Sequence, residues 1–232
     1  LSDLTLNPYL HYFTNKHYDL NSKLSKMYSS IYPDMLYNSP NINKPKKTQL
    51  IKNINLLNKK LFRNKNITYK KENYIKFDEF EKNDRLNITF VCNNCYKHSS
   101  GKLLLGLLKN IDRTLFNTSL VGVFNHLDET SEEFFENVDD VSPVEYQTNC
   151  LELIKNFREK IENTKPDILF YSDIGNDELI YYIAHGRYAP VQIVHGWGHP
   201  ITTGISNIDY FINMKNTECI DTYSEKVIFM NN

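Results

Sequence analysis

The sequence has 232 residues, of which 41% are hydrophobic and 24% charged, so it holds enough apolar material to bury a core. Its 27 Lys and Arg residues nearly balance 28 Asp and Glu residues. The resulting net charge of −1 argues against a protein that coats nucleic acid or binds membranes through a polybasic surface. No apolar run approaches the roughly 20 residues of a bilayer-spanning helix. We therefore expect neither a nucleic-acid partner nor a membrane span.

The four cysteines are too few for a disulfide scaffold in a chain of this length, so we expect a reducing compartment, the cytoplasm. The sequence begins Leu1-Ser2-Asp3, with neither a Met nor a signal-peptide pattern. We expect it to be part of a longer chain.

The first 40 residues predict one or two short helices that end near Pro33. Their apolar residues recur at helical spacing: Leu20, Leu24, Met27, Tyr28 and Ile31. Residues 41–85 contain thirteen Lys and Arg, five Asp and Glu and no Gly. This composition favours a solvated helix and linker, and a surface for an anionic partner is the alternative. We therefore expect a helical segment with a basic linker over 1–84 and a second unit over 85–232.

After Arg85, short β-branched and aromatic runs alternate with amphipathic stretches, which is typical of a parallel α/β sheet flanked by helices. We expect an acidic connector between the second strand and the second helix of this unit. The expected strands are 86–91, 119–124, 167–171, 191–195 and 208–212, and the expected helices are 101–110, 148–163 and 177–185. Such sheets bind ligands beyond the carboxyl ends of their strands. Chemistry is therefore expected in the loops after Val91, Tyr171, His195 and Ile212.

Glycine is concentrated in one segment of the chain. Five of the eight glycines fall within thirty residues: Gly175, Gly186, Gly196, Gly198 and Gly204. Glycine permits positive φ and close backbone approach, so the segment is expected to be tightly turned. Its strand leads through a Gly-rich turn to His199, Pro200 and the hydroxyls of Thr202 and Thr203. This order predicts a wall of a ligand site, and a structural crossover is the alternative.

His98 follows the first expected strand, where a helix begins. Its imidazole could accept a proton or donate to a phosphate, and a solvated loop histidine is the alternative. Cys92 and Cys95 form a C-x-x-C, but no second pair completes a zinc site, and the spacing to the helix is unlike that of a redox motif. Asp167, Asp173 and Asp177 surround the end of the third strand and could orient a histidine or a sugar hydroxyl, or lie in a solvated turn. Common nucleotide-binding and hydrolase motifs are absent from the sequence.

The Gly-rich segment resembles the catalytic region of the O-GlcNAc transferase (SPINDLY-like) family. Residues 86–98 also resemble the family's first strand and its histidine loop, and residues 166–170 resemble the strand before its glycine turn, here at Gly175. The residues that carry the likeness are Arg187, Ala189, Pro190, Gln192, Gly198, His199, Pro200, Thr202, Thr203, Gly204, Asp209, Tyr210, Tyr223, Ser224, Glu225 and Lys226.

The resemblance implies the N-terminal, Rossmann-like half of a GT-B glycosyltransferase that moves GlcNAc or a related hexose from a UDP-sugar to protein Ser or Thr with inversion, without metal or cofactor. The partners implied are a UDP-sugar, a protein or peptide acceptor and the C-terminal half of the parent chain, without which the fragment is expected to be inactive. The catalytic residues implied are His98 and His199. The substrate-binding residues implied are Gly101, Gly175, Pro200, Thr202, Thr203, Gly204, Asp209 and Tyr210.

The sequence departs from the family pattern at Cys95 and Tyr96, which replace the usual acidic and aromatic pair, and at Ile201, where some members have a small residue. Gly204 stands where the Asn-directed glucosyltransferase branch has a histidine, which argues against transfer to Asn. The alternatives are a non-catalytic module that binds a sugar nucleotide or a protein, and a relative of the Asn-directed branch. A sugar-nucleotide epimerase would need a Gly-rich loop after the first strand, and the sequence has none.

Overall fold

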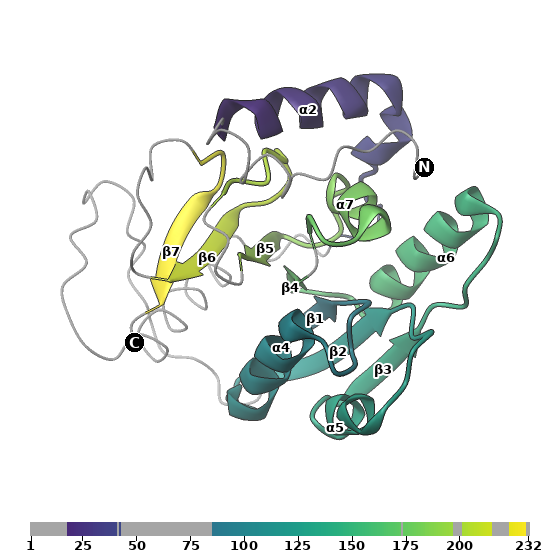
Figure 1. Ribbon diagram of the computed structural model, residues 1–232, viewed down its shortest axis with the longest axis vertical. Coiled ribbons are helices and arrows are strands. Elements are labelled where there is room, and N and C mark those ends of the chain that lie inside the picture. The colour runs from purple at the N-terminus through teal and green to yellow at the C-terminus, as the bar shows by residue number, and fades with distance from the viewer. Residues whose placement is uncertain are drawn as a thin grey trace.

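The computed structural model describes residues 18–40, 42, 85–172, 174–196, 201–214 and 223–230. Helices and strands alternate over most of this part of the chain (Figure 1). In chain order they are α2 (Tyr18–Ile31), the 3-10 helix η1 (Pro33–Leu36), β1 (Leu86–Val91), α4 (Ser99–Asn110), β2 (Phe116–Gly122), α5 (Glu129–Glu136), β3 (Asp140–Pro143), α6 (Cys150–Asn163), β4 (Ile168–Tyr171), α7 (Glu178–Ala184), β5 (Val191–His195), β6 (Tyr210–Met214) and β7 (Lys226–Met230).

The strands of the described residues form one seven-stranded sheet in the order β3-β2-β1-β4-β5-β6-β7, with every neighbouring pair parallel. The first strand, β1, lies near the middle of the sheet, and β2 and β3 follow outward on one side of it. The chain then returns to β4, on the other side of β1, and continues outward through β5 and β6 to β7. The direction of winding therefore reverses between β1 and β4, where Val91 pairs with Tyr171. In open α/β sheets a reversal of this kind marks the ligand-binding edge.

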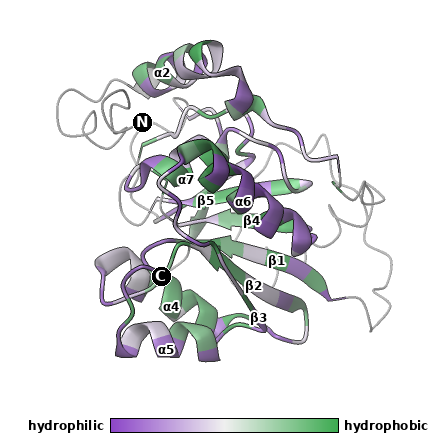
Figure 2. Cartoon of the chain, turned by 90° about the vertical axis from the view of Figure 1, so that its right-hand side faces the viewer, coloured by the Kyte–Doolittle hydropathy of each residue, from purple (hydrophilic) through white to green (hydrophobic). Residues whose placement is uncertain are grey.

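Helices cover both faces of the sheet (Figures 1 and 2). α4 and α5 lie on one face, whereas α6, α7 and α2 lie on the other. Because both faces are covered, the central strands β1 and β5 are mostly buried, and all four residues of β4 are buried. The fold class expected from the sequence, a Rossmann-like parallel sheet flanked by helices, is confirmed.

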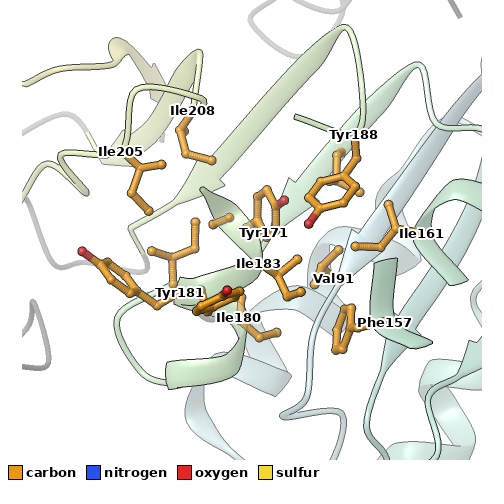
Figure 3. Packing of buried hydrophobic residues seen from close by; sticks show 14 of the residues in the cluster. Val91, Phe157, Ile161, Tyr171, Ile180, Tyr181, Ile183, Tyr188, Ile205 and Ile208 are labelled. Atoms are coloured by element: carbon orange, nitrogen blue, oxygen red, sulfur yellow. The ribbon is translucent and has the colours of Figure 1, made fainter. Parts of the chain in front are cut away.

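Side chains alternate between two core clusters as the strands pass through the sheet. Phe90 and Phe170 pack toward α4 and α5, and their ring centroids are 5.2 Å apart. Val91 and Tyr171 point the other way and meet the α6 and α7 layer, where Phe157 is fully buried. Figure 3 shows this second cluster, with side chains from strands and helices packed together.

Helix α2 docks on the sheet through one side. Leu24 and Tyr28, four residues apart, are buried, and the Tyr28 ring stands edge-on to Tyr181 of α7 at 6.2 Å. Met27 and Ile31 of the same expected stripe are exposed. The helix expected here is therefore confirmed, but its buried face is narrower than the apolar pattern indicates.

Residues 18–40 share a core with the sheet, since Leu24, Tyr28 and Met35 belong to the same buried cluster as Tyr171. A parallel bridge also joins Asn38 to Arg187. The division at residue 84 stays a prediction. The basic linker lies outside the described residues, apart from its flanking positions 42 and 85.

The sequence predicts no helix or strand within the acidic connector, but the structure has one of each. That stretch contains α5 and β3, because Asp128 and Ser131 form a reciprocal cap at the start of α5 and Phe134 is fully buried beneath it. Strand β3 has only four residues, including Pro143, so it is too short to show an alternation of apolar and polar residues. Strand β7 also went unpredicted.

In the part of the chain that is described, no helix is long and apolar enough to cross a membrane.

Candidate functional site

The loop after β1 is tied to the neighbouring elements by the amide of Asn93. Its Oδ1 accepts a hydrogen bond from the Val123 backbone N–H at 2.8 Å, and its Nδ2 donates to Asp177 Oδ2 at 2.9 Å. The other oxygen of Asp177 accepts from the Ile180 N–H and so caps α7. One asparagine therefore fixes the carboxyl ends of β1 and β2 relative to the start of α7.

His98 is the N-cap of α4. Its Nδ1 accepts a hydrogen bond from the Ser100 backbone N–H at 3.3 Å, and the Ser100 hydroxyl lies 2.8 Å from the same nitrogen. Because Nδ1 accepts a hydrogen bond, these contacts assign the proton of the neutral ring to Nε2. No described residue is hydrogen-bonded to Nε2, and the side chain is half-buried. His98 thus presents an N–H donor at this edge of the sheet.

Gly101 lies in the first turn of α4, beneath the loop that carries His98. A Cβ at this position would stand 2.4 Å from the Asn94 carbonyl oxygen and 2.7 Å from the Tyr96 carbonyl oxygen. Real contacts of that length do not occur, so only glycine lets the loop close over the helix. Gly101 therefore shapes the loop, and direct contact with substrate stays a prediction.

A cavity of about 510 Å³ opens beside this loop, at the carboxyl ends of β1 and β2 and the start of α7. Tyr96 lines it, with its ring 5.7 Å from that of His98 and 5.8 Å from that of His126. Asp128 anchors the loop from below, because its Oδ2 accepts the Lys97 N–H at 2.8 Å. That hydrogen bond, with those of the α5 cap, lowers the pKa of Asp128.

The second half of the expected site is the turn 201–204, which is held by a buried carboxylate. Glu225 Oε2 accepts from the Thr202 hydroxyl at 2.6 Å, and Oε1 accepts from the Thr203 N–H at 2.8 Å and from the Thr203 hydroxyl. All three side chains are buried. Both threonine hydroxyls therefore donate to Glu225.

Gly204 closes the turn with a φ of +73°. A Cβ there would lie 2.4 Å from the backbone of Asn21 and Ser22 in α2. Asn21 Nδ2 also donates to the Thr202 carbonyl at 2.8 Å. The turn is thus fixed between α2 on one side and Glu225, at the start of β7, on the other.

Asp209 is engaged within the fold. Arg187 Nη1 and Nη2 lie 2.6 and 3.1 Å from its two carboxylate oxygens, and the Gln192 N–H donates to Oδ2 at 2.8 Å. This bidentate pair joins the loop before β5 to the loop before β6. The adjacent Tyr210 begins β6, and burial, together with the charge of Asp209, raises its pKa. Asp209 and Tyr210 lie at the amino end of β6, whereas the His98 loop follows the carboxyl end of β1.

Gly175, with a φ of +95°, meets Thr202 and Thr203 around a small cavity of about 10 Å³. The structure therefore brings these three expected residues together, although the space would hold about one water molecule and no sugar. His199 and Pro200 lie outside the described residues, as does Asp173. The roles assigned to all of these residues stay predictions.

Sequence reasoning missed several polar residues at this edge. Asn93 lies two residues after the strand run 86–91, and a polar side chain just beyond the carboxyl end of a parallel strand is a signal that could have found it. Glu225 was part of the family pattern but had been given no role. Among the described residues, no three His, Cys, Asp or Glu side chains are grouped to hold a metal ion. Cys92 and Cys95 are both buried, and Cys95 Sγ donates to the Cys92 carbonyl.

Comparison with known proteins gives a fold likeness. No protein-family model matches the sequence, and no curated protein matches it. Among solved structures, the chain is similar to a mutant of an O-GlcNAc transferase from Thermobaculum terrenum, with a TM-score of 0.51 and 19% sequence identity. The likeness covers 64% of this chain and 28% of that one. The chain therefore shares a Rossmann-like fold with part of that protein and spans only 28% of its length.

Proposed function

We propose that this chain is the N-terminal half of a GT-B glycosyltransferase that transfers a hexose from a UDP-sugar to Ser or Thr side chains of proteins. The observation that carries the proposal is the His98 loop at the point where the sheet reverses its winding, in a fold like that of an O-GlcNAc transferase. The described motif residues support it, since hydrogen bonds join Arg187 to Asp209, Asp209 to Lys226, and Thr202 and Thr203 to Glu225.

The reaction breaks the bond between the anomeric carbon and the diphosphate oxygen and forms a bond from that carbon to the acceptor hydroxyl oxygen. The hydroxyl proton passes to a base, and UDP leaves. Negative charge grows on the diphosphate, where positioned N–H donors lower the barrier. The Nε2–H of His98 is such a donor, so this tautomer suits contact with a phosphate or substrate oxygen. His199 is proposed to lie beside the donor sugar.

The C-terminal half of the parent chain is proposed to supply most nucleotide contacts, with the crevice forming between the halves. No metal or cofactor enters this proposal. We place the activity in the cytoplasm, a reducing compartment. This agrees with the three described cysteines, Cys92, Cys95 and Cys150, which form no disulfide with one another.

The test is UDP release by the full-length parent protein from a panel of UDP-hexoses, in the presence of Ser- and Thr-containing peptides. We expect release from at least one donor, and a fall of about 100-fold or more for His98→Ala, the usual scale for a lost transition-state donor. Asn110→Ala is the matched control, because Asn110 is exposed at the far end of α4.

Release that is absent with every donor would overturn the proposal and favour a non-catalytic binding module. Full activity of both His98→Ala and His199→Ala would also contradict it. The first result concerns the reaction, and the second concerns the residues assigned to it, so the two failures are distinguishable.

A further inference from the structure

The cavity beside the His98 loop is polar, and its described lining carries no Lys or Arg charge. Its carboxylates are Asp177 and Glu178. Asp177 already accepts hydrogen bonds from Asn93 and from the α7 N-terminus. A phosphate or nucleotide would meet no cation here, so the cavity is unsuited to the diphosphate of a sugar nucleotide.

Side-chain amides provide most of the hydrogen-bonding capacity of the cavity. Asn125 and Asn176 are exposed toward it, and no hydrogen bond joins either amide to another described residue. Each amide offers two donors and an accepting oxygen in one plane. Asn93, in contrast, is held by Val123 and Asp177 and fixes the cavity floor. The available groups therefore match a ligand that both donates and accepts, as vicinal hydroxyls do.

Aromatic rings complete the lining. Tyr96 packs against both His98 and His126, with ring centroids 5.7 and 5.8 Å away, so two neighbouring rings support it. Tyr146 also lines the cavity and is 62% exposed. An exposed ring beside planar amides offers an apolar surface to the C–H face of a sugar and polar groups to its hydroxyls.

We infer that this cavity binds a neutral saccharide unit. Its volume of about 510 Å³ lies within the range of small-ligand sites and exceeds what a hexose needs. The site would be separate from the donor site proposed above and independent of transfer, since it needs neither a diphosphate nor the second half of the enzyme.

The test uses the 232-residue chain and saturation-transfer NMR with a panel of neutral probes: the methyl glycosides of glucose, galactose, N-acetylglucosamine and N-acetylgalactosamine. We expect at least one glycoside to bind with a dissociation constant of about 1 mM. Asn176→Leu and Tyr146→Ala, both at exposed positions, should each weaken it about fivefold or more. Asn110→Leu is the matched control and should leave binding unchanged.

Inorganic pyrophosphate tests the charge argument, and we expect it not to displace the bound glycoside. Failure of every glycoside to bind at roughly 20 mM would overturn the inference. Binding that survives both cavity substitutions, or that pyrophosphate displaces, would do the same. Glycoside binding without UDP release by the parent protein would support this inference while the proposed function fails. UDP release without glycoside binding would support the proposed function while this inference fails.

Discussion

At the scale of single residues, the buried carboxylate of Glu225 determines the conformation of the Thr202–Thr203 turn. It accepts from the hydroxyls of Thr202, Thr203 and Ser224 and from the Thr203 backbone N–H, and the two threonines are buried. Removing an acceptor from buried donors costs the full desolvation of each donor that is left without a partner. The turn should therefore be the most sensitive polar feature of the fold.

We predict that Glu225→Ala lowers the free energy of unfolding by about 3 kcal/mol, because three buried donors lose their acceptor. Glu225→Gln keeps one accepting oxygen and should lose about half as much. Urea denaturation followed by circular dichroism measures both. The control is Glu133→Ala, since Glu133 forms an exposed ion pair with Lys109. A loss at Glu225 no larger than that at Glu133 would contradict this account.

His185 makes stability depend on pH. Burial lowers its pKa from 6.5 to about 4, although the hydrogen bond to the Tyr181 carbonyl raises it in part. Its Nδ1–H lies 2.9 Å from that carbonyl oxygen, and Nε2 lies 3.0 Å from the Ser25 hydroxyl, so the folded chain holds the neutral ring. Burial lowers the pKa of His195 to about 4 as well.

Between pH 6.5 and 4 the unfolded chain therefore binds more protons than the folded chain, and stability falls as pH falls. We predict that His185→Gln reduces the slope of unfolding free energy against pH by about one proton, or ~1.4 kcal/mol per pH unit. Ser25→Ala should lower stability at pH 7 but keep the slope. An unchanged slope in His185→Gln, from denaturant titrations at several pH values, would contradict the assignment.

At the scale of elements, α2 and the turn 201–204 are fitted to each other by Gly204. We predict that Gly204→Ala lowers the free energy of unfolding by at least about 2 kcal/mol, because its φ is positive and the new Cβ would overlap the α2 backbone. Thermal and urea unfolding measure the loss.

Gly106 is the matched control, because a Cβ there has no neighbour within 4 Å and the position is an exposed part of α4. Gly106→Ala should stabilise the chain by about 0.5–1 kcal/mol through the helix preference of alanine. If both substitutions changed stability in the same direction by the same amount, the close packing of α2 on the turn would be disproved.

Elements with strong local patterns were predictable from the sequence. The strands 86–91 and 191–195 agree with β1 and β5 at both ends, because β-branched and aromatic residues are concentrated in these short segments. The helix α5 was missed since its acidic composition concealed one buried contact, Phe134. Strand β3 is stabilised by its pairing with β2 rather than by its own residues, and such pairing is not encoded locally.

At the scale of the whole molecule, the candidate site depends on contacts between distant segments. Asn21 meets the Thr202 carbonyl across 181 residues, and Asn93 meets Asp177 across 84. His98 could be chosen from the sequence because it follows an expected strand, whereas Gly101 was chosen through the family resemblance. The partners that define their geometry could not be chosen from the sequence, because they arise when β1, β4 and β7 assemble into one sheet.

The measurement that tests the central claim most directly is the intact mass of a Ser- or Thr-containing peptide after incubation with the full-length parent protein and a UDP-hexose. We predict a gain of one hexose or N-acetylhexosamine on the hydroxyl, with inverted anomeric configuration by NMR, and loss of the product in His98→Ala. A peptide whose mass stays unchanged with every donor would contradict the account, as would sugar attached to Asn alone.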